Sequence, residues 1–559
     1  MSDAAGSKKN AAIASVAGVL LVACVVATTV SVTKQGGGSS EGEQGLTTST
    51  KSAHAICATT DYKDTCETSL SDAKNTSNPK ELIKVAFDAA MKNLSDVISH
   101  SALLKKASKD PRTSGALDVC KQVLNDSVDD IRRSLDKVEG FGMDKMQEYA
   151  DDIKVWLSGA ITNQQTCLDA FQNTSGDTGE KMKKLLNFTG ELTSNGLAMV
   201  TQFSDVLQTL EIPGMKKRRR RILLDDEFAE ERSRLLLGMA SPSNLKPKAV
   251  VAKDGSGHFK TINGAIKAIP PKNNVLYVIK IKDGIYKEQV MVPRKMNKVV
   301  FVGEGPTKTK ITGGLNFIDG VATFKTATVA IQGDGFMARD IGIENSAGAA
   351  KHQAVALRVS ADDAIFYNCR IDGYQDTLYT HSYRQYFRNC TITGTIDFIF
   401  GDAAAVFQNC RMIVRKPLGN QACMITAQGR KDHRGVGAIV IQNSEFLPDA
   451  AIKTVKPAVT VYLGRPWKEF SRTIIMKSYI HAFIHPTGWS PWMGNFGLNT
   501  CWYAEYQNRG PGANTKARVN WKCYQKRITP EVANQFTAGV YLKGDAWIKP
   551  TGIPYTAGM

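Results

Sequence analysis

Two aspartates lie 21 residues apart in a stretch that repeats at about the same interval. Asp376 stands in the segment QDTLY (375–379) and Asp397 in the segment DFIFG (397–401). Three short segments that end in Asn-Cys recur around them, with cysteines at positions 369, 390 and 410. A period near 20 residues, built of short apolar strands and turn residues, is typical of a solenoid in which each repeat is one coil. Because neighbouring strands lie roughly 4.8 Å apart, the spacing predicts that the two carboxylates face each other across adjacent coils.

Two carboxylates stacked this closely do not ionise easily together, so one of the two pKa values is pushed up and a general acid becomes available. A single aspartate in a turn is most often only a turn former. The shared register of Asp376 and Asp397 favours catalysis over that simpler interpretation.

The residues from Ala249 onward are organised as many short strands punctuated by Gly and Asn. Examples are residues 275–281, 299–303 and 338–345, and residues 441–444 repeat the Asn-Cys segment with Ser in place of Cys. Strands that recur without long amphipathic helices between them argue against a doubly wound α/β fold. We therefore expect residues 247–559 to form an all-β domain, a parallel β-helix.

Residues 54–210 have a different sequence pattern, which predicts an all-α domain. Apolar residues follow a 3.6-residue period, proline is scarce, and a four-helix bundle is the expected outcome. Cys57 and Cys66 are placed to staple an N-terminal helical hairpin, and Cys120 and Cys167 to tie two later helices. No catalytic pattern occurs in this region.

Three further segments complete the domain organisation. Residues 1–34 contain an uncharged run, 11–32, behind Lys8-Lys9, which is typical of a signal peptide or of a signal anchor that would hold the precursor in a membrane. Residues 35–53 are Gly/Ser/Thr-rich and predict a flexible tether. Residues 211–246 carry the basic run KKRRRR (216–221) between two differently composed domains. That position favours cleavage by a subtilisin-like protease, with an uncut solvated linker as the alternative.

Composition indicates export and an acidic partner. The net charge of +18 suits nucleic acid, anionic lipid or acidic polysaccharide, but no nucleic-acid-binding motif accompanies it. Apart from Cys24, the eleven cysteines divide into sets of four and six, as disulfides in a secreted protein would. No Cys-x-x-Cys pair is present, so we expect no zinc cluster. Six Asn-x-Ser/Thr sequons agree with export.

Five ordered motifs give a specific resemblance. They are GIYKE (284–288), QAVAL (353–357), QDTLY (375–379), DFIFG (397–401) and LGRPW (463–467). Across about residues 247–545 the chain resembles the pectin methylesterases, esterases built on a right-handed parallel β-helix. The segments around Cys57, Cys66, Trp156 and Cys167 resemble the plant pectin methylesterase inhibitor family. The resemblance implies a secreted cell-wall enzyme that removes methyl esters from homogalacturonan, with its own inhibitor-like pro-region as a partner.

The resemblance also implies roles for individual residues. Asp397 would be the nucleophile and Asp376 the proton donor, with Gln375 and Gln353 donating to the oxyanion. Arg465 would keep Asp397 ionised through a charge-assisted fork. Trp467 would pack against a sugar ring, and Thr323 would contact the substrate. We expect neither a metal nor another cofactor at this site.

Two alternatives stay open at this point. Stacking distance allows Cys390 to bond either Cys369 or Cys410; the resemblance favours Cys390–Cys410, and buried free thiols are the alternative. A polygalacturonase or a pectate lyase of the same architecture would cut the chain with paired carboxylates or a Ca²⁺ cluster. Acidic residues that alternate with Gln and Arg suit oxyanion binding better than calcium.

Overall fold

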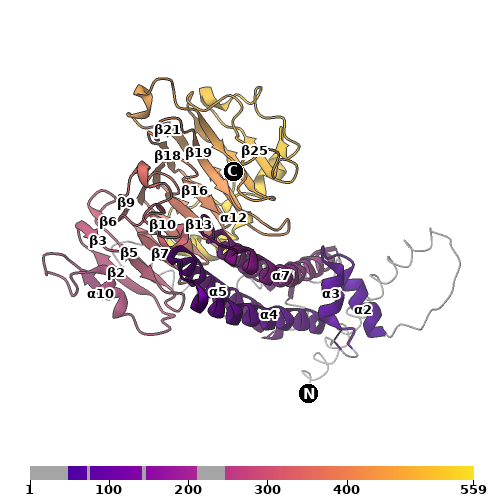
Figure 1. Cartoon of the computed structure of the whole chain (residues 1–559). Helices are drawn as coiled ribbons and strands as arrows, with labels where there is room; N and C mark the ends of the chain where they lie inside the picture. Colours follow the sequence, from indigo (N-terminus) through magenta and orange to yellow (C-terminus); the bar gives the residue numbers. More distant parts are fainter. Residues whose placement is uncertain (1–47, 72, 74–75, 141–145, 210–245) are drawn as a thin grey trace, which may run out of the picture. The chain divides into compact units, whose positions relative to one another are not determined.

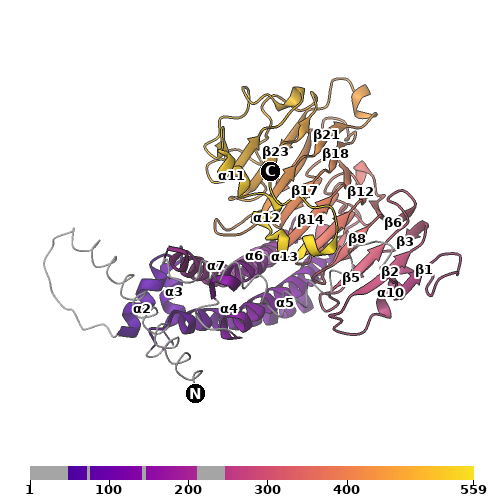
Figure 2. The same ribbon diagram turned by 180° about the vertical axis from the view of Figure 1, so that it is seen from behind.

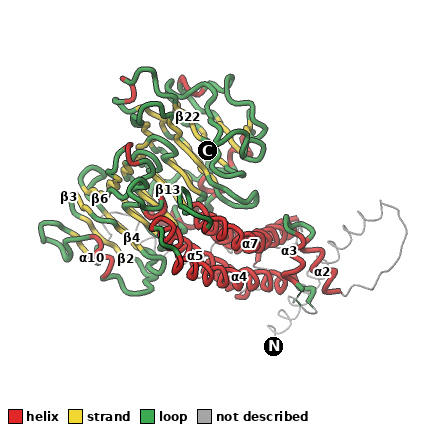
Figure 3. The backbone as a smooth tube through the Cα atoms, in the orientation of Figure 1, coloured by secondary structure: helices red, strands yellow, loops and turns green. Residues whose placement is uncertain are grey.

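The computed structural model describes residues 48–71, 73, 76–140, 146–209 and 246–559 (Figure 1). These residues form two compact units, one helical and one rich in strands, and the two kinds of structure are separated along the chain (Figure 3). The apolar run 11–32 and the basic run 216–221 lie outside the described residues. Within the described ranges, no helix is both long and apolar enough to cross a membrane.

The helical unit is built from four long helices preceded by two short ones. Their bounds are α2 (Thr48–Cys57), α3 (Lys63–Leu70), α4 (Pro79–Ala107), α5 (Pro111–Gly140), α6 (Met146–Asp169) and α7 (Thr178–Thr209). Helices α4 and α6 each pack against both α5 and α7, which makes the predicted four-helix bundle. Helix α2 begins at Thr48, so the last residues of the predicted tether are helical.

Local sequence explains where helix α4 begins and how the two short helices are tied together. Pro79 is the first residue of α4, and the side chain of Asn78 caps that helix by accepting a hydrogen bond from the Lys80 N–H at 3.0 Å. Cys57–Cys66 and Cys120–Cys167 form disulfides, as the sequence predicts, and Cys501–Cys523 is a third. The first bond closes the α2–α3 hairpin.

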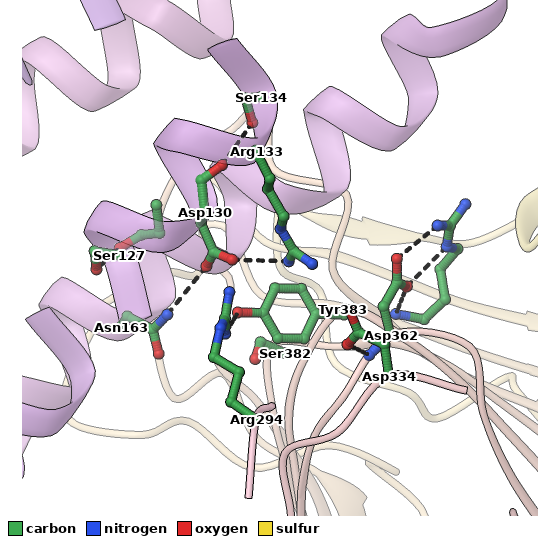
Figure 4. Close-up of polar contacts among 12 residues, drawn as sticks. Ser127, Asp130, Arg133, Ser134, Asn163, Arg294, Asp334, Asp362, Ser382 and Tyr383 are labelled. Carbon is green, nitrogen blue, oxygen red and sulfur yellow. Dashed lines mark hydrogen bonds and ion pairs between the residues drawn. The ribbon is translucent and has the colours of Figure 1, made fainter. Parts of the chain in front are cut away.

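A charged group lies inside the bundle. The Asp130 side chain is fully buried, with an exposed fraction of 0%, and pairs with Arg133 at 2.7 Å (Figure 4). Asn163 of α6 donates a hydrogen bond to the same carboxylate at 3.2 Å. A buried carboxylate needs such partners because an uncompensated one costs several kcal/mol. The bundle is therefore held by polar contacts as well as by apolar packing.

The second unit is a parallel β-helix whose coils contribute strands to three sheets. One sheet of residues 246–559 has eleven strands in the order β1 (Ala249–Val251), β2 (Tyr277–Ile281), β5 (Val299–Val302), β8 (Met337–Arg339), β11 (Ala364–Tyr367), β14 (Arg384–Arg388), β17 (Ala404–Gln408), β20 (Ala438–Gln442), β23 (Arg472–Met476), β25 (Trp502–Tyr506) and β26 (Tyr524–Gln525). Another has seven, in the order β22 (Val461–Gly464), β19 (Cys423–Gln428), β16 (Ile399–Gly401), β13 (Leu378–Ser382), β10 (Leu357–Ser360), β7 (Val329–Ile331) and β4 (Val290–Val292). The third has eight, in the order β24 (Tyr479–Ile480), β21 (Glu445–Pro448), β18 (Arg411–Val414), β15 (Thr391–Gly394), β12 (Arg370–Asp372), β9 (Gly342–Asn345), β6 (Thr309–Gly313) and β3 (Gly284–Lys287). The solenoid architecture predicted from the repeat is confirmed.

The register follows the repeat seen in the sequence. Residues 21 apart, such as Phe366 and Phe387, are direct partners on β11 and β14, and their rings stack with centroids 5.0 Å apart. The asparagine of each Asn-Cys segment turns the chain out of the sheet in a left-handed conformation, with φ between 51° and 54° at Asn368, Asn389 and Asn409. Asn tolerates this conformation better than most residues, which explains its recurrence.

The predicted Cys390–Cys410 disulfide is not formed. Cys369, Cys390, Cys410 and Cys423 are all buried free thiols. In-register side chains of parallel strands point the same way, so stacked sulfur atoms tend to keep the strand spacing of roughly 4.8 Å, more than twice an S–S bond length. Each thiol instead approaches backbone carbonyls, as Cys390 Sγ does with Phe366 O at 3.4 Å. Burial also raises the pKa of the Cys390 thiol well above its usual value, which disfavours the reactive thiolate.

The C-terminal residues cover the outer face of the eleven-stranded sheet, close to β14 and β17 (Figure 2). Gln408 donates a hydrogen bond to the Thr556 carbonyl at 2.8 Å, and Gln442 donates one to the Gly558 carbonyl at 2.9 Å. Strands such as β17 are therefore buried on both faces, which explains their continuous apolar sequence. The remaining helical segments are short: α10 (Ile262–Lys267), α11 (Pro530–Asn534), α12 (Ala538–Tyr541), α13 (Gly544–Trp547), η3 (Thr323–Lys325), η4 (Ala349–Lys351), η5 (Ile452–Thr454), η6 (Pro511–Ala513) and η7 (Lys549–Thr551).

Candidate active site

Asp376 and Asp397 occupy matching places on adjacent coils. Each lies two residues before its strand, and the first residues of those strands, Leu378 of β13 and Ile399 of β16, are direct partners. The Asp376 N–H donates a hydrogen bond to the Ile396 carbonyl at 3.0 Å, which joins the two turns. The aspartates are 9% and 5% exposed. The backbone pairing therefore places the two carboxylates on neighbouring coils, as the 21-residue spacing predicted.

Both aspartates adopt the left-handed backbone conformation. The φ angle is 60° at Asp376 and 50° at Asp397. Residues other than glycine rarely take this conformation, and where they do, the surrounding structure must hold them there. Asp340 and Asp363 of the same solenoid share this conformation, at φ 58° and 54°, so it describes the turns that hold the two carboxylates and does not by itself single them out.

Arg465 forms a bidentate ion pair with Asp397, one of the two carboxylates. Its Nε and Nη2 atoms donate to Oδ1 and Oδ2 of Asp397 at 2.9 and 2.6 Å, which is a bidentate fork. Arg465 directly follows β22, and its guanidinium stacks on the Trp492 ring with the Cζ atom 4.3 Å from the centroid. Gly464, at the end of β22, allows that strand to pack closely against β19, because a Cβ there would lie 2.0 Å from its partner Thr426 Oγ1.

The electrostatics of the two carboxyls differ. Burial raises the pKa of Asp376 well above its usual value, and the nearby Asp397 charge raises it further. Burial also raises the pKa of Asp397, but the Arg465 fork opposes the shift. Asp397 is thus the one of the pair that ionises more readily, and Asp376 the one that keeps its proton to higher pH.

The two glutamines singled out in the sequence stack beside this pair. Gln353 and Gln375 form a parallel β-bridge, and the Ala354 N–H donates to the Gln375 carbonyl at 3.2 Å. Thr323 begins η3 on the next coil, where its carbonyl accepts a hydrogen bond from Thr326 Oγ1 at 2.8 Å. Thr323, Gln353 and Gln375 lie in the segments that precede β7, β10 and β13, which are neighbouring strands of the seven-stranded sheet.

Aromatic residues beside the carboxylates extend the site, and two of them have no role assigned from sequence. Tyr379 and Phe400 each lie three residues after an aspartate and stack with centroids 4.2 Å apart. The Trp467 ring packs edge-on against both, at 6.3 and 5.8 Å. Side chains alternate along a strand, so Tyr379 points to the opposite side from the core residue Leu378. This alternation is the sequence signal that could have placed Tyr379 beside the carboxylates. No pattern in the sequence indicated that Trp492 would stack against Arg465.

Within the part of the chain that the structure describes, no group of three or more His, Cys, Asp or Glu residues is arranged to hold a metal ion. The polar groups available for chemistry at this site are the carboxyls of Asp376 and Asp397, the guanidinium of Arg465, and the side-chain amides of Gln353 and Gln375.

Comparison with known proteins identifies the family. A family model described as pectinesterase matches residues 248–545, and one described as plant invertase/pectin methylesterase inhibitor matches residues 51–199. Pectinesterase/pectinesterase inhibitor 28 of Arabidopsis thaliana is 50% identical over 556 residues, 99% of this chain and 75% of that protein. A pectinesterase of Petunia integrifolia is 54% identical over 380 residues, 68% of this chain and 99% of its own. The solved pectin methylesterase from carrot is 50% identical, with a TM-score of 0.56 over 56% of this chain and 99% of that one.

The chain therefore belongs to the pectinesterase family. Its β-helix carries pectin methylesterase activity, and its helical unit is an inhibitor-like domain.

Proposed function

We propose that this chain hydrolyses the methyl esters of cell-wall homogalacturonan to pectate and methanol, with Asp397 as nucleophile and Asp376 as acid and base. The single observation that carries the proposal is the buried pair itself, one carboxylate forked to Arg465 at 2.6 and 2.9 Å and its neighbour without that fork. The net charge of +18 suits an acidic polysaccharide.

In the first step an Asp397 oxygen attacks the carbonyl carbon of the methyl ester. The side-chain N–H groups of Gln353 and Gln375 donate to the oxyanion of the tetrahedral intermediate. The C–O bond to the methoxy group then breaks, and Asp376 gives its proton to the departing oxygen, so that methanol leaves. An acyl-enzyme anhydride on Asp397 remains.

In the second step water attacks the galacturonate carbonyl carbon of the anhydride. Asp376, now ionised, takes a proton from that water, and the bond to the Asp397 oxygen breaks. Asp397 returns as a carboxylate and Asp376 as an acid, so the enzyme is unchanged. Trp467 offers its apolar ring to a sugar, and Thr323 contacts the substrate from the neighbouring coil.

The test is to follow methanol and reducing ends together on methylesterified homogalacturonan. We expect methanol to appear without new reducing ends and at the same rate after chelation. Chain shortening would instead assign a polygalacturonase or a pectate lyase, which cleave the backbone.

We propose further that a subtilisin-like protease cuts the precursor in the linker 211–246, after the basic residues at 216–221, and that the helical unit restrains the enzyme or aids its export before the cut. The two differently composed units on either side of the linker support this order of events. Residues 11–32 direct the chain to the secretory route, either as a cleaved signal or as an anchor of the precursor.

Mutation of the basic run tests the processing proposal. A chain with residues 216–221 changed to Gln should stay uncut and show lower methanol release than the processed enzyme at equal concentration. The matched control carries Gln at Lys183 and Lys184, an exposed basic pair of the bundle outside the linker. Equal activity of cut and uncut chains, together with normal secretion of a chain that lacks the helical unit, would contradict a restraining or export role.

A further inference from the structure

Arg415, which directly follows β18, holds the turn that leads into the acid of the site. Its Nη1 atom donates to the Gly373 carbonyl at 3.0 Å, and its Nη2 atom donates to Tyr374 Oη at 2.8 Å. Its guanidinium also lies over the Tyr374 ring, with Cζ 3.9 Å from the ring centroid. One side chain thus makes three contacts with the two residues that precede Gln375 and Asp376.

The same turn is fixed from its other side by backbone and hydroxyl groups. The Tyr374 carbonyl accepts hydrogen bonds from the Thr395 N–H at 2.9 Å and from Thr377 Oγ1 at 3.1 Å. Gly373 allows this fold, because a Cβ there would lie 2.6 Å from Thr377 Oγ1. On the side of the Tyr374 ring, the contacts of Arg415 hold the turn in place.

The turn needs constraint because Asp376 lies in the left-handed region, at φ 60°. A strained residue keeps its conformation only where its surroundings determine it. The planar guanidinium is suited to this task, since it stacks on a ring and donates in fixed directions at the same time, which an ammonium group does not do. Arg411, four residues earlier, lacks such contacts with the turn and forms an exposed pair with Glu445 at 3.2 Å.

We propose that Arg415, with Tyr374, is a positioning residue that fixes the 373–376 turn and so holds Gln375 and Asp376 in the geometry that the reaction requires. This inference rests on the proposed function, in which Gln375 and Asp376 act on the ester. The guanidinium touches the turn and acts through it, so its loss should slow the chemistry without weakening substrate binding.

Arg415→Lys and Tyr374→Phe test the proposal in the full chain, with Arg411→Lys as the matched control. We expect Arg415→Lys to lower kcat by about 10- to 100-fold, because a misplacement of about 1 Å costs up to about 100-fold, while KM stays within about twofold. Tyr374→Phe keeps the ring but loses the acceptor, and should lower kcat less. The double variant should be no worse than Arg415→Lys, because both changes remove the same contact. Arg411→Lys should match the parent.

Further readouts separate positioning from other roles. A displaced Asp376 should shift the alkaline limb of the pH–rate profile in Arg415→Lys and not in Arg411→Lys. A raised KM with unchanged kcat would overturn the proposal by making Arg415 a substrate ligand, and a lower Tm with unchanged kcat would reduce it to a stabilising residue. Asp397→Asn serves as reference: if that variant is inactive while Arg415→Lys is normal, only the positioning inference fails, whereas an active Asp397→Asn would defeat the proposed function itself.

Discussion

Asp397→Asn should abolish methanol release, with a fall in kcat of about 10⁴-fold or more, the scale expected when a covalent nucleophile is removed. The amide oxygen is a poor nucleophile and cannot form the anhydride. Release of methanol from methylesterified homogalacturonan measures the loss. Asp283→Asn, the same chemical change at an exposed position, should leave the rate unchanged.

Folding must be separated from chemistry in this experiment, because Asn would leave the half-buried Arg465 without its ionic partner. Asp397→Glu provides the second variant. It keeps the charge beside Arg465 but moves the carboxylate by one methylene, so the fold should be retained while the rate still falls by orders of magnitude. Near-normal turnover in either variant, with an unchanged circular dichroism spectrum, would remove Asp397 from the nucleophile role.

The features of the fold that depend on periodicity were accessible from the sequence. A period near 21 residues predicts which residues become partners on neighbouring coils, and Phe366 and Phe387 are such partners. The same holds for the neighbouring positions of Asp376 and Asp397. The helical texture before the linker predicted the bundle, because each long helix buries one apolar stripe.

The features that depend on side-chain direction were not accessible. The Cys390–Cys410 bond was expected from resemblance, but stacked side chains point in parallel and the thiols remain free. The Arg415–Tyr374 contact joins residues 41 apart on different coils, and no spacing rule singles it out. The covering of the eleven-stranded sheet by the C-terminal residues likewise depends on the path of the chain after its last strand.

The pH–rate profile should distinguish the two carboxylates. Attack needs Asp397 ionised, so the rate falls as pH drops through its pKa, which burial raises and Arg465 lowers. Departure of methanol needs Asp376 protonated, so the rate falls as pH rises through its pKa, which burial and the Asp397 charge raise well above the usual value. We therefore expect a bell-shaped profile in kcat/KM. In Asp376→Asn the alkaline limb should disappear.

Asp376→Asn should lower methanol release by about 10²- to 10⁴-fold, the usual range for a lost general acid or base. The cause can be isolated by changing the leaving group, since a nitrophenolate departs without a proton whereas methoxide does not. With a nitrophenyl ester of an oligogalacturonate, Asp376→Asn should give a burst of one equivalent of nitrophenolate and then turn over slowly, because the anhydride forms but water is not activated. Asp397→Asn should give no burst with either ester. A burst from Asp397→Asn would reverse the two roles, and the absence of a nitrophenolate burst in Asp376→Asn would reject the role of Asp376 as the acid needed only for the methoxide.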